Sequence, residues 1–188
     1  TGLDGLPIAD KAAGDAEGLL LTDDDDLLVS FERDHRIWSY GPLARPASRP
    51  TAVLSPNAAF EDNSGMEGLA AAPGGGWRVA GEGGGLWDCD PSACRTIQTH
   101  PSAPLPDSAF RITALDRDPS GDGWFVVQRL YRAPIDMRAQ VRRMAPDGGL
   151  GPVLISLKLP GTTDNFEGVA AERRGGATRL YILDRKST

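Results

Sequence analysis

The stretch Asn165-Phe166-Glu167-Gly168-Val169-Ala170 places an acidic residue and a glycine ahead of apolar residues. The same phrase occurs earlier as Asp15-Ala16-Glu17-Gly18-Leu19 and as Gly65-Met66-Glu67-Gly68-Leu69-Ala70. A degenerate copy is Arg111-Ile112-Thr113-Ala114-Leu115, in which Thr113 stands in the place of the glutamate. The steps between these positions are 50, 46 and 54 residues, from 17 to 67, from 67 to 113 and from 113 to 167. An internal repeat of about 50 residues indicates a propeller or a solenoid.

A second landmark recurs 15 residues after each of the first three positions. A polar residue follows an apolar run there, as Glu32, Glu82 and Gln128. The fourth unit has Ile182 at that offset and Asp184 two residues later. Two landmarks at a constant separation argue against a chance pattern.

Short apolar runs bounded by turn residues favour strands over helices along the whole chain. The 23 glycines and 15 prolines are spaced like turns between such strands. We therefore expect an all-β chain, a single β-propeller domain with four-stranded blades of about 50 residues. The repeat units are 11–60, 61–106, 107–160 and 161–188. The expected strands include 18–21, 27–31, 36–40, 51–54, 77–80, 86–89, 94–98, 124–130, 140–144, 153–157, 166–171 and 180–183.

The fourth unit supplies only two of these strands, so the sequence covers about three and a half blades. Each blade of a propeller covers its neighbour and the ring has to close, so an incomplete ring would leave apolar faces uncovered. We expect the remaining blades to come from chain segments outside this sequence.

Charge and hydropathy exclude two classes of partner. The net charge of −6 argues against a broad nucleic-acid surface, which needs a basic face. No apolar run approaches the roughly 18 residues that a membrane-spanning helix requires. We expect neither a nucleic-acid partner nor a membrane span.

Cys89 and Cys94 are the only cysteines, and the turn-forming residues Asp90-Pro91-Ser92-Ala93 separate them. We expect a small hairpin disulfide, which would place the protein in an oxidising compartment. One alternative is a pair of reduced thiols in a surface turn. Another is a metal site that includes His100, although these three residues fall short of the usual four ligands.

The phrases Val29-Ser30-Phe31-Glu32-Arg33-Asp34-His35-Arg36-Ile37 and Asn165-Phe166-Glu167-Gly168-Val169-Ala170 resemble a bacterial family called phytase-like, or esterase-like activity of phytase. The likeness extends from about residue 15 to residue 183. It implies an exported, periplasmic or secreted protein with a β-propeller of six blades. It also implies a mature length well above 188 residues.

The repeated glutamates are the candidate metal ligands. A residue that recurs at the start of the innermost strand of each blade faces the central channel, so Glu17, Glu67 and Glu167 should converge. Converging carboxylates repel one another, so they would bind a divalent cation or pair with arginines. Calcium or another divalent cation is the expected metal. The alternative is that each glutamate hydrogen-bonds backbone amides of the neighbouring blade.

Basic residues near the second strands are candidates for substrate binding and catalysis. Arg33, Arg36 and Arg129 have the chemistry to hold phosphate or carboxylate oxygens. The alternatives are a salt bridge to Glu32 or an exposed edge. His35 is a candidate general acid or base, with a hydrogen-bonded turn histidine as the alternative. The acidic run 23–26 lacks the spacing of an EF-hand loop and is expected to be a solvated turn.

Two functions follow from these residues. The first is a metal-assisted hydrolase of phosphate or carboxylic esters, which binds a small-molecule ester or anionic ligand at the channel mouth. A metal-activated water is its expected nucleophile, because the sequence contains no Gly-x-Ser-x-Gly elbow. The second is a non-catalytic propeller that binds a ligand or partner at the same place. Fold alone does not separate the two, since propellers host both.

Overall fold

The computed structural model describes residues 1–54, 60, 65–99, 105–106, 108–133, 136–158 and 165–184. Within these ranges the chain forms 14 β-strands and no helix. The strands are β1 (Ala16–Leu21), β2 (Asp26–Phe31), β3 (Arg36–Pro42), β4 (Thr51–Leu54), β5 (Met66–Ala71), β6 (Trp77–Gly81), β7 (Leu86–Cys89), β8 (Cys94–Gln98), β9 (Arg111–Arg117), β10 (Trp124–Ala133), β11 (Asp136–Met144), β12 (Leu150–Lys158), β13 (Phe166–Arg174) and β14 (Ala177–Asp184). The expectation of an all-β chain is confirmed.

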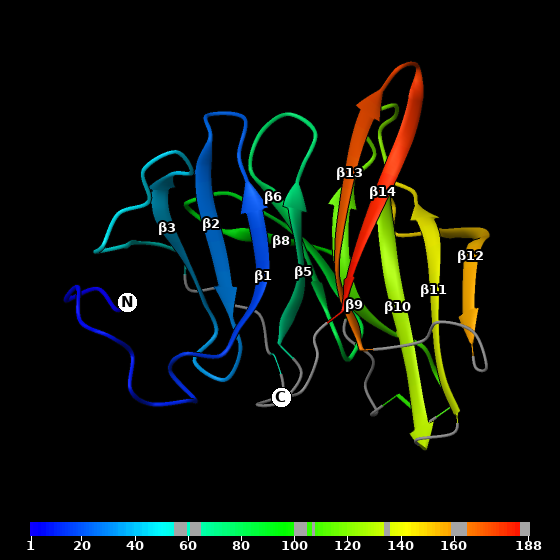
Figure 1. Cartoon of the computed structure of the whole chain (residues 1–188), viewed down its shortest axis with the longest axis horizontal. Coiled ribbons are helices and arrows are strands. Elements are labelled where there is room, and N and C mark those ends of the chain that lie inside the picture. Colours follow the sequence, from blue (N-terminus) through cyan, green and yellow to red (C-terminus); the bar gives the residue numbers. More distant parts are fainter. Residues whose placement is uncertain are drawn as a thin grey trace.

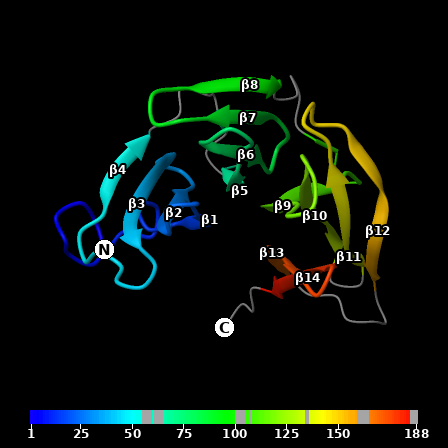
Figure 2. The ribbon, with the colours of Figure 1, turned by 90° about the horizontal axis from the view of Figure 1, so that it is seen from above.

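The strands form four small antiparallel sheets, each made of strands that are consecutive in the chain. The first sheet is β1–β4, the second β5–β8, the third β9–β12 and the fourth β13–β14. The sheets lie side by side in the cartoon of Figure 1. Seen from above in Figure 2, they fan out in an arc, with β1, β5, β9 and β13 innermost and β4, β8 and β12 outermost. The repeated phrase therefore begins the innermost strand of a sheet.

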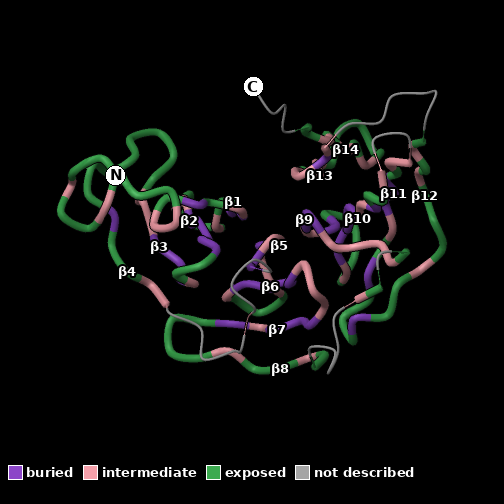
Figure 3. The backbone as a smooth tube through the Cα atoms, turned by 90° about the horizontal axis from the view of Figure 1, so that it is seen from below, coloured by how far each residue is buried: buried purple, intermediate pink, exposed green. Residues whose placement is uncertain are grey.

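The hydrophobic core lies between neighbouring sheets rather than in one central mass. Leu69 and Val79 of the second sheet pack with Leu20 and Leu28 of the first. The opposite face of the second sheet packs on the third, and the third packs on Phe166 of the fourth. Strand β6 is buried along its whole length because both of its faces are covered, whereas the outer strands are mostly exposed (Figure 3).

The glycine of the repeated phrase allows the inner strands to approach one another. A Cβ atom on Gly18 would lie 2.9 Å from Cβ of Leu69, and one on Gly68 would lie 2.8 Å from Cβ of Leu115. Both contacts are with the inner strand of the next sheet, and real Cβ atoms do not approach so closely. The phrase needs glycine here for space.

The second sheet contains a disulfide bond. Cys89 ends β7, Cys94 begins β8, and their sulfur atoms are bonded across the hairpin. His100, the third residue of the alternative metal site, lies outside the described residues. Among the described residues, none belongs to a helix of the length and apolarity needed to cross a bilayer.

Candidate functional site

The inner strands enclose a pocket of about 470 Å³. Its lining includes Glu17 of β1, Glu67 of β5 and Glu167 of β13, together with residues of β9. The structure thus brings together the three glutamates that the repeat singled out, from three different sheets.

Two more carboxylates lie beside Glu17. Carboxylate oxygens of Asp15, Glu17 and Glu32 all lie within 4.8 Å of one another. Asp15 and Glu32 are each only 8% exposed. The backbone N–H of Glu32 donates to the carbonyl oxygen of Asp15 at 2.8 Å, which holds the two residues side by side. Three oxygen ligands at this spacing suit a hard divalent cation.

Sequence reasoning missed Asp15 and Glu32 as site residues. The signal for Glu32 was present, because it marks the position 15 residues after Glu17. Pairing of β1 with β2 brings these two positions together, with Ala16 opposite Phe31. Glu82 occupies the same position in the second sheet. We refer to Asp15, Glu17, Glu32, Glu67, Glu82 and Glu167 as the acidic cluster.

Glu67 is the most perturbed member of the acidic cluster. Burial is the main cause that raises the pKa of its carboxyl to about 9, and the nearby charges of Glu17, Glu82, Glu32 and Glu167 contribute in the same direction. A carboxyl group with this pKa holds a proton at neutral pH unless a cation replaces it. Glu67 can therefore act as a proton donor inside the pocket.

Arginine side chains offset part of the negative charge. Arg129 Nη1 donates to Glu167 Oε1 at 3.1 Å, and Asn165 Nδ2 donates to the same oxygen. Burial raises the pKa of Glu82, while Arg129 and Arg111 act to lower it. Arg129 thereby joins the third sheet to the fourth at the edge of the acidic cluster.

Thr113 replaces the glutamate in the third sheet. Its hydroxyl donates to the carbonyl oxygen of Phe166 at 2.8 Å, and the side chain is 1% exposed. Ser30 makes a similar bond to the carbonyl oxygen of Met66 at 2.9 Å, between the first and second sheets. These two hydroxyl groups each join the inner part of one sheet to the inner strand of the next.

Arg33 and Arg36 have different surroundings. Arg33 has a positive φ of 64°, and its Nε forms an ion pair with Asp15 Oδ2 at 2.9 Å. Arg36 is 6% exposed, and its guanidinium carbon lies 4.1 Å from the ring centroid of Phe31 and 4.2 Å from that of Trp38. Burial lowers the pKa of Arg36. Its guanidinium is committed to the packing of the first sheet, whereas Arg33 and Arg129 border the acidic cluster.

Comparison with known proteins bears on this arrangement. A family model described as phytase-like, esterase-like activity of phytase, matches residues 1–184. The chain belongs to this family. The resemblance inferred from the repeated phrases is confirmed. No curated protein matches the sequence of this phytase-like chain.

Among solved structures, the phytase-like chain is similar to the major allergen Mala s 1 of Malassezia sympodialis. The two share 15% sequence identity, with a TM-score of 0.50. The match covers 90% of the phytase-like chain and 49% of the allergen, so the chain spans about half of the length of that structure. At this identity the likeness concerns the fold alone.

His35 of the phytase-like chain lies in an aromatic stack. Its ring centroid is 4.9 Å from that of Phe60, and the centroid of Phe60 is 4.8 Å from that of Trp87. Both ring nitrogens of His35 are buried and have no hydrogen-bond partner among the described residues. His35 is not among the residues that line the inner pocket. The chemistry that the pocket offers comes from its carboxyl groups and the two bordering arginines.

Proposed function

We propose that this phytase-like chain is part of an exported β-propeller that uses a divalent cation, calcium first, to hydrolyse phosphate or carboxylic esters. The observation that carries the proposal is the meeting of Glu17, Glu67 and Glu167 in one pocket, with Asp15 and Glu32 beside Glu17. The family description, esterase-like activity of phytase, is in keeping with an ester as substrate.

The residues of the acidic cluster fit a cation. Arg33 pairs with Asp15, and Arg129 pairs with Glu167. Glu32 lies beside Asp15 and is 8% exposed as a residue. Keeping the carboxylates of Asp15, Glu17 and Glu32 within 4.8 Å of one another is costly, and a cation held among them would offset that cost.

The remaining groups have roles that suit ester hydrolysis. A bound divalent cation would polarise an ester oxygen and lower the pKa of a bound water. Asp15, Glu17 and Glu32 would hold the cation. Glu67, whose pKa is raised mainly by burial, would donate its proton to the departing oxygen. Arg33 and Arg129 would hold the anionic group of the substrate.

The proposal includes the whole molecule. We propose a ring of six blades, in which further chain supplies the blades that this sequence lacks. The arc of four sheets and the 49% coverage of the allergen structure support it. The disulfide between Cys89 and Cys94 supports a periplasmic or secreted location, since such bonds persist in oxidising compartments.

The test uses the full-length protein. Calcium binding is measured by calorimetry, and hydrolysis is followed with p-nitrophenyl phosphate and p-nitrophenyl acetate, for the wild type and for Glu17→Gln/Glu32→Gln. We expect the double variant to bind calcium at least about tenfold more weakly and to lose turnover. Glu172→Gln is the control, because Glu172 lies on β13 with Tyr181 as its partner. Turnover that persists in a chelator and in the double variant would contradict the proposal.

A second candidate function is a non-catalytic propeller that binds a ligand through the same pocket. The ion pairs of Asp15 with Arg33 and of Glu167 with Arg129 favour it, because they neutralise part of the acidic cluster within the chain. Calcium binding without turnover of either ester would identify this function.

A further inference from the structure

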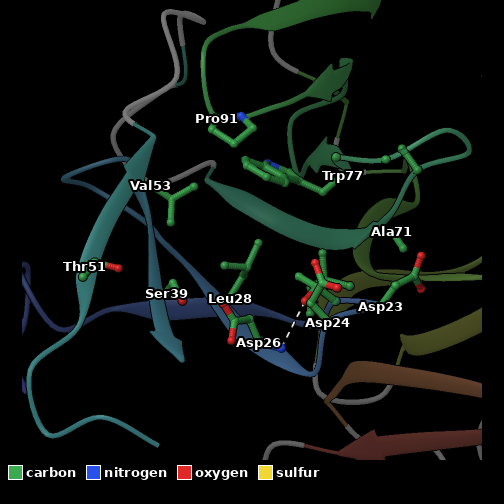
Figure 4. Close-up of a pocket in the computed structure, with 15 residues that line it drawn as sticks. Asp23, Asp24, Asp26, Leu28, Ser39, Thr51, Val53, Ala71, Trp77 and Pro91 are labelled. Atoms are coloured by element: carbon green, nitrogen blue, oxygen red, sulfur yellow. Dashed lines mark hydrogen bonds between the residues drawn. The ribbon is translucent and has the colours of Figure 1, made fainter. Parts of the chain in front are cut away.

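A second pocket, of about 460 Å³, lies between the first and second sheets. We call it the junction pocket. Figure 4 shows Trp77 and Pro91 on one side of it and Asp23, Asp24 and Asp26 on the other. The three aspartates form no ion pair with the described residues. The junction pocket therefore combines an aromatic wall with negative charge that the described chain leaves unbalanced.

The next junction, between the second and third sheets, is filled by an arginine. Arg78 is 1% exposed, and its guanidinium carbon lies 3.8 Å from the ring centroid of Trp124. Its Nε pairs with Asp88 Oδ1 at 2.8 Å, and its Nη2 donates to the carbonyl oxygen of Pro146 at 2.8 Å. This junction holds a guanidinium group between an aromatic ring, a carboxylate and a proline carbonyl.

Strand register shows which residues of the two junctions correspond. Arg78 lies opposite Asp88 in β6 and β7, as Leu28 lies opposite Ser39 in β2 and β3. Trp124 lies opposite Met144, and Trp77 lies opposite Cys89. Met144 and Cys89 each stand two residues before a proline, Pro146 and Pro91. Residues Leu28, Ser39, Trp77 and Pro91 thus correspond to Arg78, Asp88, Trp124 and Pro146. All four of the former line the junction pocket.

The junction pocket consequently lies where the next junction holds its guanidinium. Leu28 is shorter than Arg78 and carries no charge, so it packs in one core cluster with Trp77 but brings no cation to that ring. The third sheet has Phe125 at this strand position, with Arg143 5.2 Å from its ring centroid. Among the described residues of the first three sheets, only the first sheet has an aliphatic residue, Leu28, at this position.

The indole N–H groups of the two tryptophans also differ, because only that of Trp124 donates a hydrogen bond to a described residue. Trp124 Nε1 donates to the carbonyl oxygen of Ala71 at 2.9 Å, which ties the third sheet to the second. Trp77 is 4% exposed, and its Nε1 is buried without a hydrogen-bond partner among the described residues. A buried donor without an acceptor is costly; a guanidinium group only donates, so a water bound in the pocket would have to supply the acceptor.

We propose that the junction pocket binds a guanidinium group, carried either by a free guanidino compound or by an arginine side chain of a polypeptide. The group stacks on Trp77, donates to the carbonyl oxygen of Pro91, and is neutralised by Asp23, Asp24 and Asp26. The volume of about 460 Å³ falls in the range of small-ligand sites. This site is separate from the acidic cluster, and its existence does not depend on the proposed hydrolase.

The test measures binding of two probes to the full-length protein by calorimetry. The probes are agmatine and the capped peptide acetyl-Gly-Arg-Gly-amide. The decisive variant is Leu28→Arg/Ser39→Asp, which rebuilds the arginine and aspartate of the next junction inside the pocket. We expect it to weaken binding at least about tenfold, because its own guanidinium occupies the site.

A second variant keeps the test independent of core packing. Asp23→Asn/Asp24→Asn alters only exposed side chains, and we expect roughly fivefold weaker binding from the lost charge. Asp122→Asn, an exposed aspartate in the turn between β9 and β10, should leave binding unchanged. Cadaverine should bind less tightly than agmatine, because an ammonium stacks on tryptophan less well than a guanidinium.

The outcomes are distinct. Binding of agmatine alone supports a free guanidino compound as ligand, and binding of both probes supports an arginine side chain. If neither probe binds the wild type, the proposal is wrong. It is equally wrong if binding survives in Leu28→Arg/Ser39→Asp, or is as strong in Asp23→Asn/Asp24→Asn as in Asp122→Asn.

Discussion

At the scale of single residues, Glu67 shows how the repeat concentrates charge. Its carboxyl is enclosed by the inner strands, and burial followed by four neighbouring glutamates raises its pKa from 4.5 to about 9. The folded chain therefore binds a proton at neutral pH that the unfolded chain releases. This difference couples the stability of the fold to pH.

Replacing Glu67 by glutamine should remove that coupling. Between about pH 5 and pH 9 the folded wild type retains the proton and the unfolded state does not, so its free energy of unfolding falls as pH rises. One such proton contributes a slope of up to about 1.4 kcal/mol per pH unit. Urea unfolding at a series of pH values should show Glu67→Gln gaining stability relative to the wild type as pH increases. Parallel curves for the two proteins would contradict the raised pKa, and Glu172→Gln provides the control.

The sequence predicted the position of a residue where that position is set by the repeat. It did not predict which side chains pack around a residue. Glu17, Glu67 and Glu167 share a repeat position, so their convergence in one pocket could be predicted. Arg36 and His35 belong to the same phrase of sequence, yet aromatic rings surround both of them. Those neighbours come from β2, β3, β7 and residue 60, and no spacing in the sequence indicates that they meet.

At the scale of elements, the inner strands are shaped by the glycine that follows each repeated glutamate. Gly18 and Gly68 lie where the inner strand of one sheet crosses close to that of the next. A side chain there would force the sheets apart, because sheet interiors are packed without spare space. The phrase thus encodes both the position of the carboxyl group and the contact between sheets.

Substituting Gly68 by alanine should destabilise the protein by roughly 1–3 kcal/mol, since the added methyl group would lie 2.8 Å from Cβ of Leu115. Gly151→Ala is the matched control, because a Cβ on Gly151 in β12 has its nearest neighbour at 3.5 Å. Thermal unfolding of both variants checks the expectation. Equal midpoints for the two would show that the inner strands adjust without cost.

Most strands could be predicted from turn residues and short apolar runs. The expected 86–89 and 94–98 coincide with β7 and β8, since a turn bounds each closely. The hairpin of β10 and β11 extends further than expected, to Ala133 and from Asp136. Its outer end is polar and is held by the ion pair of Arg138 with Asp136 at 2.7 Å. Hydrophobic patterning does not detect a strand end stabilised in this way.

At the scale of the whole molecule, neighbouring sheets meet mainly through their inner and middle strands. Strand β5 contacts β1 on one side and β9 on the other, and β9 also contacts β13. The outer strand β12 is largely exposed, as is β4. Resistance to local opening should therefore decrease from the inside of the arc to its outside.

Native-state hydrogen exchange tests this gradient. We expect the amides of β5 and β9 to have the highest protection factors and those of β4 and β12 the lowest, because opening an inner strand disrupts two junctions between sheets. Protection factors correct for intrinsic exchange rates and allow strands to be compared within one sample. Protection of β12 equal to that of β9 would indicate that whole sheets open as units.

Thr113 makes the distribution of charge around the inner pocket unequal. Three inner strands carry a carboxyl group at the repeat position, and β9 carries this hydroxyl instead. Arg129 offsets the charge of Glu167, and Glu67 holds a proton at neutral pH, so the excess negative charge lies toward Glu17 of β1. The electric field across the pocket is consequently asymmetric about the axis on which the inner strands converge. A ligand with a positive and a neutral end would have one preferred orientation, with its positive end toward the first sheet.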